Sequence, residues 1–196
     1  MIEILLICTG NICRSPIAAG LFRERGRGLA EPLRVRTAGT GAAVGQPPTP
    51  EALAAASELG ADIREHRSAP IHPGRVEADL VLAMTASHRQ QILHRAPDAA
   101  PRTFTLKELA ALLRELPPAE APPSRESALA RIARAHALRA TRSLAEDEDV
   151  ADPIGLSVEA YRAAAWEIDG TVREILGGLF GLGEEVEENR SRAPGD

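Results

Sequence analysis

Aromatic residues and lysine are scarce in this sequence, and both shortages bear on its partners. Phe, Trp and Tyr make up 3% of the 196 residues, which leaves few rings to stack on the bases of a single-stranded nucleic acid. Lys107 is the only lysine, the other basic residues are scattered arginines, and the formal net charge is −5. Because no basic cluster exists on this acidic chain, we expect no nucleic-acid partner.

Long hydrophobic runs are also missing. No stretch approaches the roughly 18 apolar residues that a membrane helix needs. The run EILLIC is too short for the core of a signal peptide and lacks a basic leader. We therefore expect a cytoplasmic protein with no membrane contact. Thiols stay reduced in that compartment, so Cys8 and Cys13 are better suited to reactive or packing roles than to a structural disulfide.

Short apolar runs alternate with helical patterns along most of the chain. Strands are predicted at residues 2–8, 33–39, 78–84 and 102–106, and helices at residues 16–27, 48–60, 85–96, 107–116 and 157–180. This alternation predicts an α/β fold, with a short parallel sheet of about four strands and helices on both of its faces.

Two segments fall outside this alternation. Residues 117–148 contain a proline-rich turn, an arginine- and alanine-rich helix and an acidic stretch, which predict a surface insertion that packs loosely. Residues 184–196 form a polar tail that we expect to be frayed. The remainder of residues 1–183 is predicted to be one domain that carries the insertion.

The stretch CTGNICRS, residues 8–15, connects the first predicted strand to the first predicted helix. Ser15 is suited to the N-cap of that helix and Pro16 to its first position. Backbone N–H groups in such a turn converge on an anion, with Gly10 available for a positive φ. A phosphate-binding loop is therefore predicted, made by Thr9, Gly10, Asn11, Ile12, Cys13 and Arg14, with the planar fork of Arg14 on two phosphate oxygens.

The same stretch predicts a nucleophile and requires an acid elsewhere. The N–H dipoles, the helix N-terminus and Arg14 all favour the thiolate form of Cys8, and Ser15 could donate a hydrogen bond to its sulfur. A thiolate below a bound phosphate is aimed at phosphorus. The leaving group then needs a proton. Asp152, whose backbone is restricted by Pro153, is the candidate donor in EDEDVADPIG.

A chance cluster, a zinc site and a nucleotide-binding loop all agree less well with CTGNICRS. Cysteine and arginine fall at this spacing by chance in an arginine-rich chain, but chance does not explain the strand-to-helix context. A zinc site would need a second pair of ligands at suitable spacing, and a nucleotide P-loop would need Gly-Lys-Ser/Thr. GTGAAVG at residues 39–45 resembles a dinucleotide fingerprint, but its glycine spacing differs and no helix follows at once.

The stretch ICTGNICRSPIAAGLF, together with a late Asp-Pro, resembles the low-molecular-weight protein tyrosine phosphatases of bacteria. The resemblance continues in TAG at 37–39, EHR at 65–67, ADLVLAMTASHRQQI at 78–92 and DVADP at 149–153. It implies hydrolysis of phosphotyrosine in a phosphorylated protein substrate through a phosphocysteine intermediate. It also implies that neither a metal nor another cofactor takes part.

The resemblance also implies a role for each matching residue. Cys8 matches the nucleophile, Arg14 the phosphate-binding arginine, and Asp152 the acid that protonates the leaving group and then activates water. The residues that match the supporting hydrogen-bond network are Asn11, Ser15, Thr37 and His66. Cys13 matches a second cysteine that forms a reversible disulfide with the nucleophile in several relatives; the alternative is an apolar packing role.

The walls of the predicted pocket bear on the substrate. Many family members have tyrosines after Asp-Pro and an aromatic residue in the second loop, whereas this chain has Ile154-Gly155-Leu156 and GTGAAVG. A related branch acts on protein phosphoarginine and resembles the segment ADLVLAMTASHRQQI. That branch has threonine at the position of Ile12, and isoleucine is the version found in tyrosine-directed members. We therefore favour phosphotyrosine, with phosphoarginine as the alternative.

Two further functions remain as alternatives of another class. A non-catalytic phosphate-binding module would be marked by the loss of the nucleophile, the arginine or the acid, and all three residues are present. A dinucleotide-binding protein built on GTGAAVG would be marked by tight NAD binding. Arsenate reduction on the same scaffold requires a further cysteine pair, and no cysteine follows Cys13.

Overall fold

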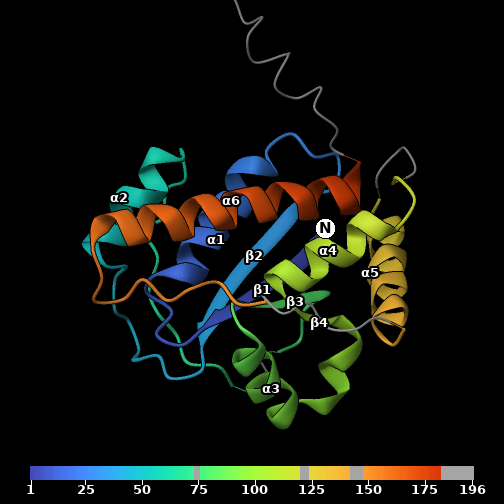
Figure 1. Cartoon of the computed structure of the whole chain (residues 1–196), viewed down its shortest axis with the longest axis horizontal. Helices are drawn as coiled ribbons and strands as arrows, with labels where there is room; N and C mark the ends of the chain where they lie inside the picture. The colour runs from blue at the N-terminus through green and yellow to red at the C-terminus, as the bar shows by residue number, and fades with distance from the viewer. Residues whose placement is uncertain (73–75, 120–123, 142–147, 182–196) are drawn as a thin grey trace, which may run out of the picture.

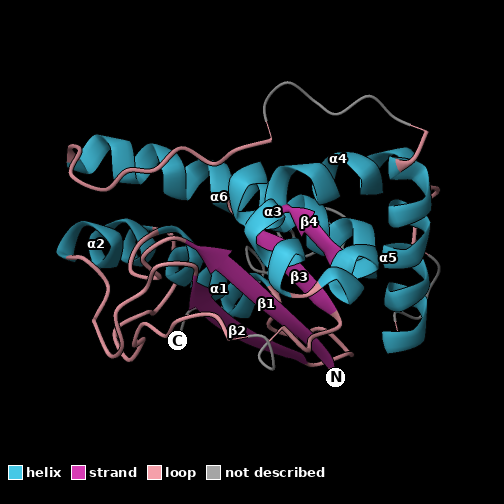
Figure 2. Cartoon of the chain, turned by 90° about the horizontal axis from the view of Figure 1, so that it is seen from below, coloured by secondary structure: helices cyan, strands magenta, loops and turns pink. Residues whose placement is uncertain are grey.

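The protein forms a four-stranded parallel sheet covered by helices on both faces. The computed structural model describes residues 1–72, 76–119, 124–141 and 148–181. The strands are β1 (Ile2–Cys8), β2 (Leu33–Gly39), β3 (Leu80–Ala83) and β4 (Thr103–Thr105), in the order β2-β1-β3-β4. The helices are α1 (Arg14–Arg25), α2 (Pro50–Glu58), α3 (Ala86–Arg95), α4 (Leu106–Glu115), α5 (Arg125–Arg139) and α6 (Val158–Phe180), with a 3₁₀ turn η2 (Pro97–Arg102) after α3 (Figures 1 and 2). The predicted fold class is confirmed.

Strand β1 lies in the middle of the sheet and is buried on both faces, which explains its nearly continuous apolar sequence. Ile4 and Leu6 belong to the larger hydrophobic cluster, which also includes residues of α1, α2, α4, α5 and α6. Leu5 and Ile7 point the other way and belong to a smaller cluster with Ile92 of α3. The period of two along one strand therefore divides the core into two layers.

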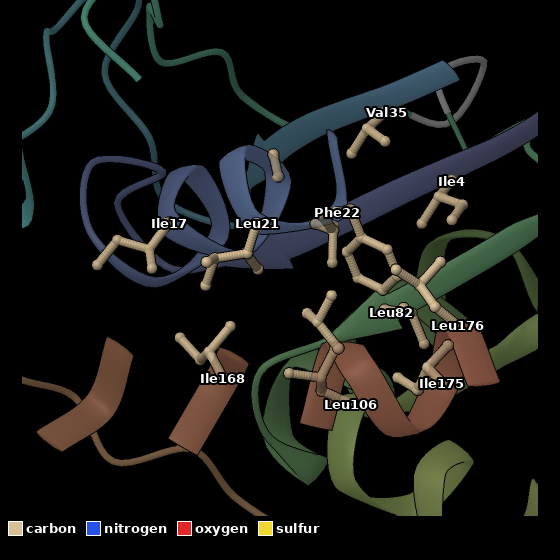
Figure 3. Packing of buried hydrophobic residues seen from close by; sticks show 14 of the residues in the cluster. Ile4, Ile17, Leu21, Phe22, Val35, Leu82, Leu106, Ile168, Ile175 and Leu176 are labelled. Carbon is tan, nitrogen blue, oxygen red and sulfur yellow. The ribbon is translucent and has the colours of Figure 1, made fainter. Parts of the chain in front are cut away.

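The larger cluster packs α1 and α6 against one face of the sheet. Figure 3 shows Phe22 of α1 lying between Ile4 of β1 and Leu176 of α6, and all three side chains are buried. Since the four strands are parallel, their carboxyl ends meet at one edge of the sheet. The loops that follow β1, β2 and β3 gather there, which is where open parallel sheets bind their ligands.

The start of α1 differs from the prediction. The helix begins at Arg14 rather than after Ser15, and Cys13 occupies the N-cap position without a side-chain cap. The predicted Ser15 cap is therefore wrong. Ser15 is fully buried in the first helical turn, where its hydroxyl meets other partners in the binding site described below.

The expectation that residues 117–148 pack loosely is also wrong for the part that the structure describes. Helix α5 lies at the edge of the molecule beside α4, at the opposite end from α2 (Figure 1). It buries Ala128, Ile132 and Ala135 in the larger cluster. The predicted tail, residues 184–196, lies outside the described residues.

Within the described ranges, no helix combines the length and the apolar character that a bilayer crossing requires.

Candidate active site

The loop between β1 and α1, residues 8–14, is the centre of the candidate site, and we refer to it as the binding loop. It leaves the middle strand at the carboxyl edge of the sheet and runs into the N-terminus of α1. The end of β2 holds it from the side, since Thr40 N donates to Cys8 O at 2.9 Å and Gly41 N donates to Thr9 O at 3.1 Å.

Gly39, at the end of β2, allows this close approach. A Cβ at Gly39 would overlap the carbonyl oxygen of Thr9 and lie 2.7 Å from the Cβ of Ala42. Only glycine leaves room for the two loops to meet there. The sequence analysis noted TAG only as a resemblance, and the close approach of the chains is the reason that glycine is required.

Asn11 provides the sharp turn of the binding loop. Its φ is +56°, the left-handed region, whereas Gly10, which was expected to take a positive φ, does not. Asparagine tolerates this conformation because its side chain can bond locally. Here the Asn11 Oδ1 accepts from Ala69 N at 2.9 Å and its Nδ2 donates to Ser15 Oγ at 2.9 Å.

The sulfur of Cys8 receives two hydrogen bonds. Asn11 N donates to the Sγ at 3.2 Å, and Ser15 Oγ lies 3.0 Å from it. The amide of Asn11 can only donate to the Ser15 oxygen, so the Ser15 hydroxyl proton is free to point at sulfur. Both partners then act as donors, which suits a thiolate at Cys8.

His66 and Thr37, the other two predicted supporting residues, differ in their contacts. The Nε2 of His66 lies 2.7 Å from the carbonyl oxygen of Asn11, which can only accept, so this nitrogen carries the proton. Burial lowers the pKa of His66 below its usual value. Thr37 lies on β2 opposite Leu6, and its side chain makes no hydrogen bond within the described residues.

Unpaired donors line the binding loop. No acceptor within the described residues receives the backbone N–H of Gly10, Ile12, Cys13 or Arg14. The side chain of Arg14 is almost fully buried, and its Nε has no partner there. Buried polar groups are normally paired, so this concentration of free donors at a helix N-terminus indicates an anion site.

The predicted acid lies beside this arginine. Arg14 Nη2 donates to Asp152 Oδ2 at 2.5 Å, and Arg14 Nη1 donates to the carbonyl oxygen of Val150 at 2.9 Å. Val150 N is held in turn by the oxygen of Met84, just after β3, at 2.8 Å. The structure thus brings Cys8, Arg14 and Asp152 to one place from distant parts of the sequence, because the chain returns to the same edge of the sheet.

A cleft of about 530 Å³ opens above Arg14 and Asp152. Most of its lining residues carry polar side chains and none is Phe, Tyr or Trp; the lining consists of Thr9, Arg14, Thr40, Gly41, Thr85, Ser87, His88, Gln91, Asp149, Val150, Ala151 and Asp152. Ile12 is not part of the lining, since its side chain packs against the larger hydrophobic cluster. Within the described ranges, no three His, Cys, Asp or Glu side chains gather as a metal site would require.

His88 is a cleft residue that the sequence analysis did not identify. Its Nε2 lies 2.8 Å from Thr9 Oγ1 and its Nδ1 lies 2.8 Å from Thr85 Oγ1, so the ring connects α3 to the binding loop. Burial, aided by the charge of Arg14, lowers the pKa of His88 to about 4. The ring is therefore neutral near pH 7. The signal available in the sequence was its place shortly after Met84, within a segment that resembled the family.

Cys13 lies in the core behind the binding loop. Its Sγ is 3.6 Å from the hydroxyl of Tyr161 and 3.8 Å from Thr49 Oγ1. Burial raises the pKa of this thiol above its usual value. Both cysteines are free thiols in the structure.

Comparison with known proteins agrees with this geometry. The family described as "Low molecular weight phosphotyrosine protein phosphatase" matches residues 3–116. A protein-arginine-phosphatase of Geobacillus stearothermophilus is 32% identical over 174 residues, which cover 88% of this chain and 93% of the relative. A probable low molecular weight protein-tyrosine-phosphatase, EpsP, of Ralstonia nicotianae is 39% identical over 107 residues, which cover 54% of this chain and 71% of the relative.

Solved structures show the same fold over most of the chain. The YwlE arginine phosphatase of Geobacillus stearothermophilus aligns with a TM-score of 0.68 at 27% identity, covering 100% of both chains. A low molecular weight protein tyrosine phosphatase from T. tengcongensis aligns with a TM-score of 0.70 at 29% identity, covering 91% of this chain and 100% of the other. The chain therefore belongs to the low molecular weight phosphotyrosine protein phosphatase family.

Proposed function

We propose that the chain hydrolyses phosphorylated side chains of proteins through a phosphocysteine at Cys8, and that phosphoarginine is its preferred substrate. The observation that carries the proposal is the set of free N–H donors around a thiol that receives two hydrogen bonds. Three phosphoryl oxygens fit such a set of donors, and the free Nε of Arg14 adds a charged one.

In the first step the Cys8 thiolate attacks phosphorus. An S–P bond forms, and the bond between phosphorus and the leaving nitrogen or oxygen breaks. Asp152 gives its proton to the leaving atom, so the arginine or tyrosine side chain departs with that proton. The backbone donors and Arg14 stabilise the charge that develops on the phosphoryl oxygens.

In the second step Asp152, now a carboxylate, takes a proton from water. The water oxygen attacks phosphorus, the S–P bond breaks, and phosphate leaves. Cys8 returns to its thiolate form, held again by Asn11 N and Ser15 Oγ. No metal takes part in either step of this proposal.

Two observations favour phosphoarginine. The lining of the cleft offers hydroxyls and the carboxylates of Asp149 and Asp152, and no Phe, Tyr or Trp ring on which a phosphotyrosine could stack. Carboxylates suit a guanidinium, which leaves as a cation. In addition, the arginine phosphatase relative aligns over 88% of this chain, whereas the tyrosine phosphatase relative aligns over 54%.

Phosphotyrosine is the second candidate. Ile12 matches the isoleucine that is found at this position in the tyrosine-directed branch. In addition, EpsP is 39% identical over the part that it matches, whereas the arginine phosphatase relative is 32% identical over its longer alignment. Against it, the partly buried Ile12 packs against the larger hydrophobic cluster and does not line the cleft. Its influence on the substrate must then act through the shape of the binding loop.

The chemistry is tested with p-nitrophenyl phosphate in the presence of EDTA. We expect Cys8→Ser to abolish turnover. Asp152→Ala should lower the turnover of phenyl phosphate, whose poor leaving group needs the proton, by about 10²–10⁴-fold, the usual contribution of a positioned acid, and that of p-nitrophenyl phosphate by much less. Full activity of Cys8→Ser would refute the mechanism.

The substrate is tested with two peptides of one sequence that carry phosphoarginine or phosphotyrosine. We expect a higher kcat/KM for phosphoarginine. Asp149→Asn is expected to lower kcat/KM for phosphoarginine more than for phosphotyrosine, because only the guanidinium uses that charge. Ile12→Thr serves as the matched probe of the second candidate. A wild type that prefers phosphotyrosine, and gains phosphoarginine activity in Ile12→Thr, would contradict the substrate assignment.

A further inference from the structure

Arg139, in the last turn of α5, joins a buried network of charges. Its Nε and Nη2 donate to the two carboxylate oxygens of Glu108 on α4, at 2.7 Å and 3.0 Å. Nη2 also donates to Thr103 O at 2.8 Å, and the guanidinium lies 4.1 Å from the centre of the Phe104 ring. This side chain is therefore fixed from several directions rather than free at the surface.

The network continues from Glu108 toward the cleft. Arg89 on α3 donates to Glu108 Oε2 at 2.6 Å, and the same Arg89 nitrogen lies 3.4 Å from Glu148 Oε2. Both carboxylates are almost fully buried, with exposed side-chain fractions of 6% and 7%. Two arginines and two glutamates thus form one charge-balanced chain. In it, Arg89 hydrogen-bonds Glu108 and makes a longer ion pair with Glu148, whose buried Oε2 receives no hydrogen bond within the described residues.

Glu148 opens the segment that carries the catalytic acid. Residues 148–153, the acid segment, are held at other points by Asp149 Oδ1, which accepts from Ala86 N at 2.7 Å, and by the bonds of Val150 described above. Those anchors connect the segment to α3, to the end of β3 and to Arg14. Glu148 is the anchor that leads away from the site, through Arg89 and Glu108, to α5.

We propose that α5 positions the acid segment, and through it Asp152, by way of the chain Arg139–Glu108–Arg89–Glu148. Arg139 satisfies both oxygens of Glu108, so the charge of Arg89 remains available to Glu148. Without Arg139, Arg89 is the only arginine left to Glu108, and it moves away from Glu148. The acid segment then loses its partner at one end.

This proposal rests on the proposed function, because it concerns the reaction that Asp152 assists. A displaced acid protonates the leaving group poorly. Substrates whose leaving groups need that proton should therefore suffer most, while those with good leaving groups should be nearly unaffected. A general loss of stability would instead lower the activity toward all substrates alike.

The test measures kcat/KM for phenyl phosphate and p-nitrophenyl phosphate, whose leaving groups are poor and good. For Arg139→Met and Arg89→Met we expect the phenyl phosphate value to fall about tenfold, a part of what a general acid contributes, and the p-nitrophenyl phosphate value to change less than about twofold. Asp152→Ala, which lacks the acid altogether, sets the largest difference expected between the losses for the two substrates. Arg139→Lys keeps the charge but not the fork, and we expect an intermediate value.

Arg131→Met is the matched control. Arg131 is a buried arginine of α5, but its hydrogen bonds go to the carbonyl oxygens of Gly178 and Pro117, away from the acid segment. We expect this variant to lower the melting temperature without changing the ratio of the kcat/KM values for the two substrates. Equal ratios in Arg139→Met, Arg131→Met and wild type would overturn the proposal while leaving the phosphatase function intact. A wild type without Cys8-dependent turnover would instead refute the function, and the proposal with it.

Discussion

Asn11 allows the geometry of the binding loop to be tested by substitution. Its φ of +56° is the only positive value found at a non-glycine residue in the described part of the chain. Its fully buried side chain bonds Ala69 N and Ser15 Oγ. Replacing Asn11 by alanine removes both side-chain bonds and keeps a Cβ in the left-handed region. Replacing it by glycine removes the same bonds but tolerates that φ.

The magnitudes follow from these two differences. Each lost hydrogen bond is worth about 1 kcal/mol of unfolding free energy, so both variants lose about 2 kcal/mol. Alanine in the left-handed region costs about 1–2 kcal/mol more. Glycine avoids this cost, but the greater freedom of its unfolded chain lowers the unfolding free energy by about 0.4–1 kcal/mol. We therefore expect Asn11→Ala to lose about 3–4 kcal/mol of unfolding free energy, and Asn11→Gly to be more stable than it by about 1 kcal/mol.

Urea unfolding followed by circular dichroism measures these values, and turnover of p-nitrophenyl phosphate is measured in parallel. Both variants should lose activity, because the Ser15 hydroxyl loses the donor that orients its proton toward Cys8. Gly10→Ala is the control, since Gly10 has no positive φ and its new Cβ would lie 3.3 Å from a flexible Ile12 carbon. If Gly10→Ala destabilised more than Asn11→Ala, the assignment of the turn to Asn11 would be wrong.

Three other predictions concern neighbouring residues. Gly39→Ala should disrupt the binding loop and reduce turnover by about tenfold or more, measured with p-nitrophenyl phosphate, because its Cβ would meet the backbone of Thr9. Hydrogen peroxide should oxidise Cys8 to a sulfenic acid, which the Cys13 thiol converts to a disulfide with release of water, so dithiothreitol should restore the activity of the wild type but not that of Cys13→Ser. Equal recovery of activity in both would contradict this role of Cys13. The raised pKa of Cys13 predicts that the disulfide forms faster at higher pH. His88 has a folded pKa of about 4 against 6.5 in the unfolded chain, so the unfolded chain binds the proton first as pH falls. The unfolding free energy should therefore decrease as the pH falls from 6.5 to about 4, and His88→Gln should remove that part of the slope in urea titrations.

The sequence alone was sufficient to predict the strands of the sheet and the course of the backbone through the candidate site. β1 reads as a buried strand because it is apolar at every position except Glu3, and a strand with helices on both faces needs that pattern. The turn from Cys8 to Arg14 was also predictable, because a short loop that joins a buried strand to a helix can take few backbone conformations. The strand-to-helix context therefore carried more information than the spacing of cysteine and arginine.

The roles of short polar side chains were harder to predict. Ser15 satisfies the local rule for a helix cap, yet its hydroxyl is used by Cys8 and Asn11. Gly10 satisfies the rule for a positive φ, yet Asn11 takes it, because its amide group finds partners from distant segments. Local rules describe what a residue can do alone, and here tertiary partners decided between the options.

The role of α5 could not be predicted for a related reason. Its buried stripe consists mostly of alanines, which give a weak apolar signal, and Arg139 covers Phe104 with a side chain that a sequence pattern counts as exposed. Its partners lie on α4 and, through Arg89, on α3. Ion pairs between helices leave no period in the sequence, so only the three-dimensional arrangement identifies them.

In the proposed mechanism, the ion pair between Arg14 and Asp152 connects phosphate binding to acid catalysis. Arg14 Nη1 is held by Val150, Nη2 by Asp152, and Nε has no partner within the described residues. A phosphoryl group that takes the Nε and Nη2 edge of the guanidinium must displace the Asp152 carboxylate, because both anions need the same donor. Asp152 is 41% exposed, so it can turn into the cleft, while the Arg14–Val150 bond keeps its segment in place. The same event that fills the binding loop would thus release the acid beside the leaving group, and substitutions in the acid segment should change substrate binding and proton transfer together.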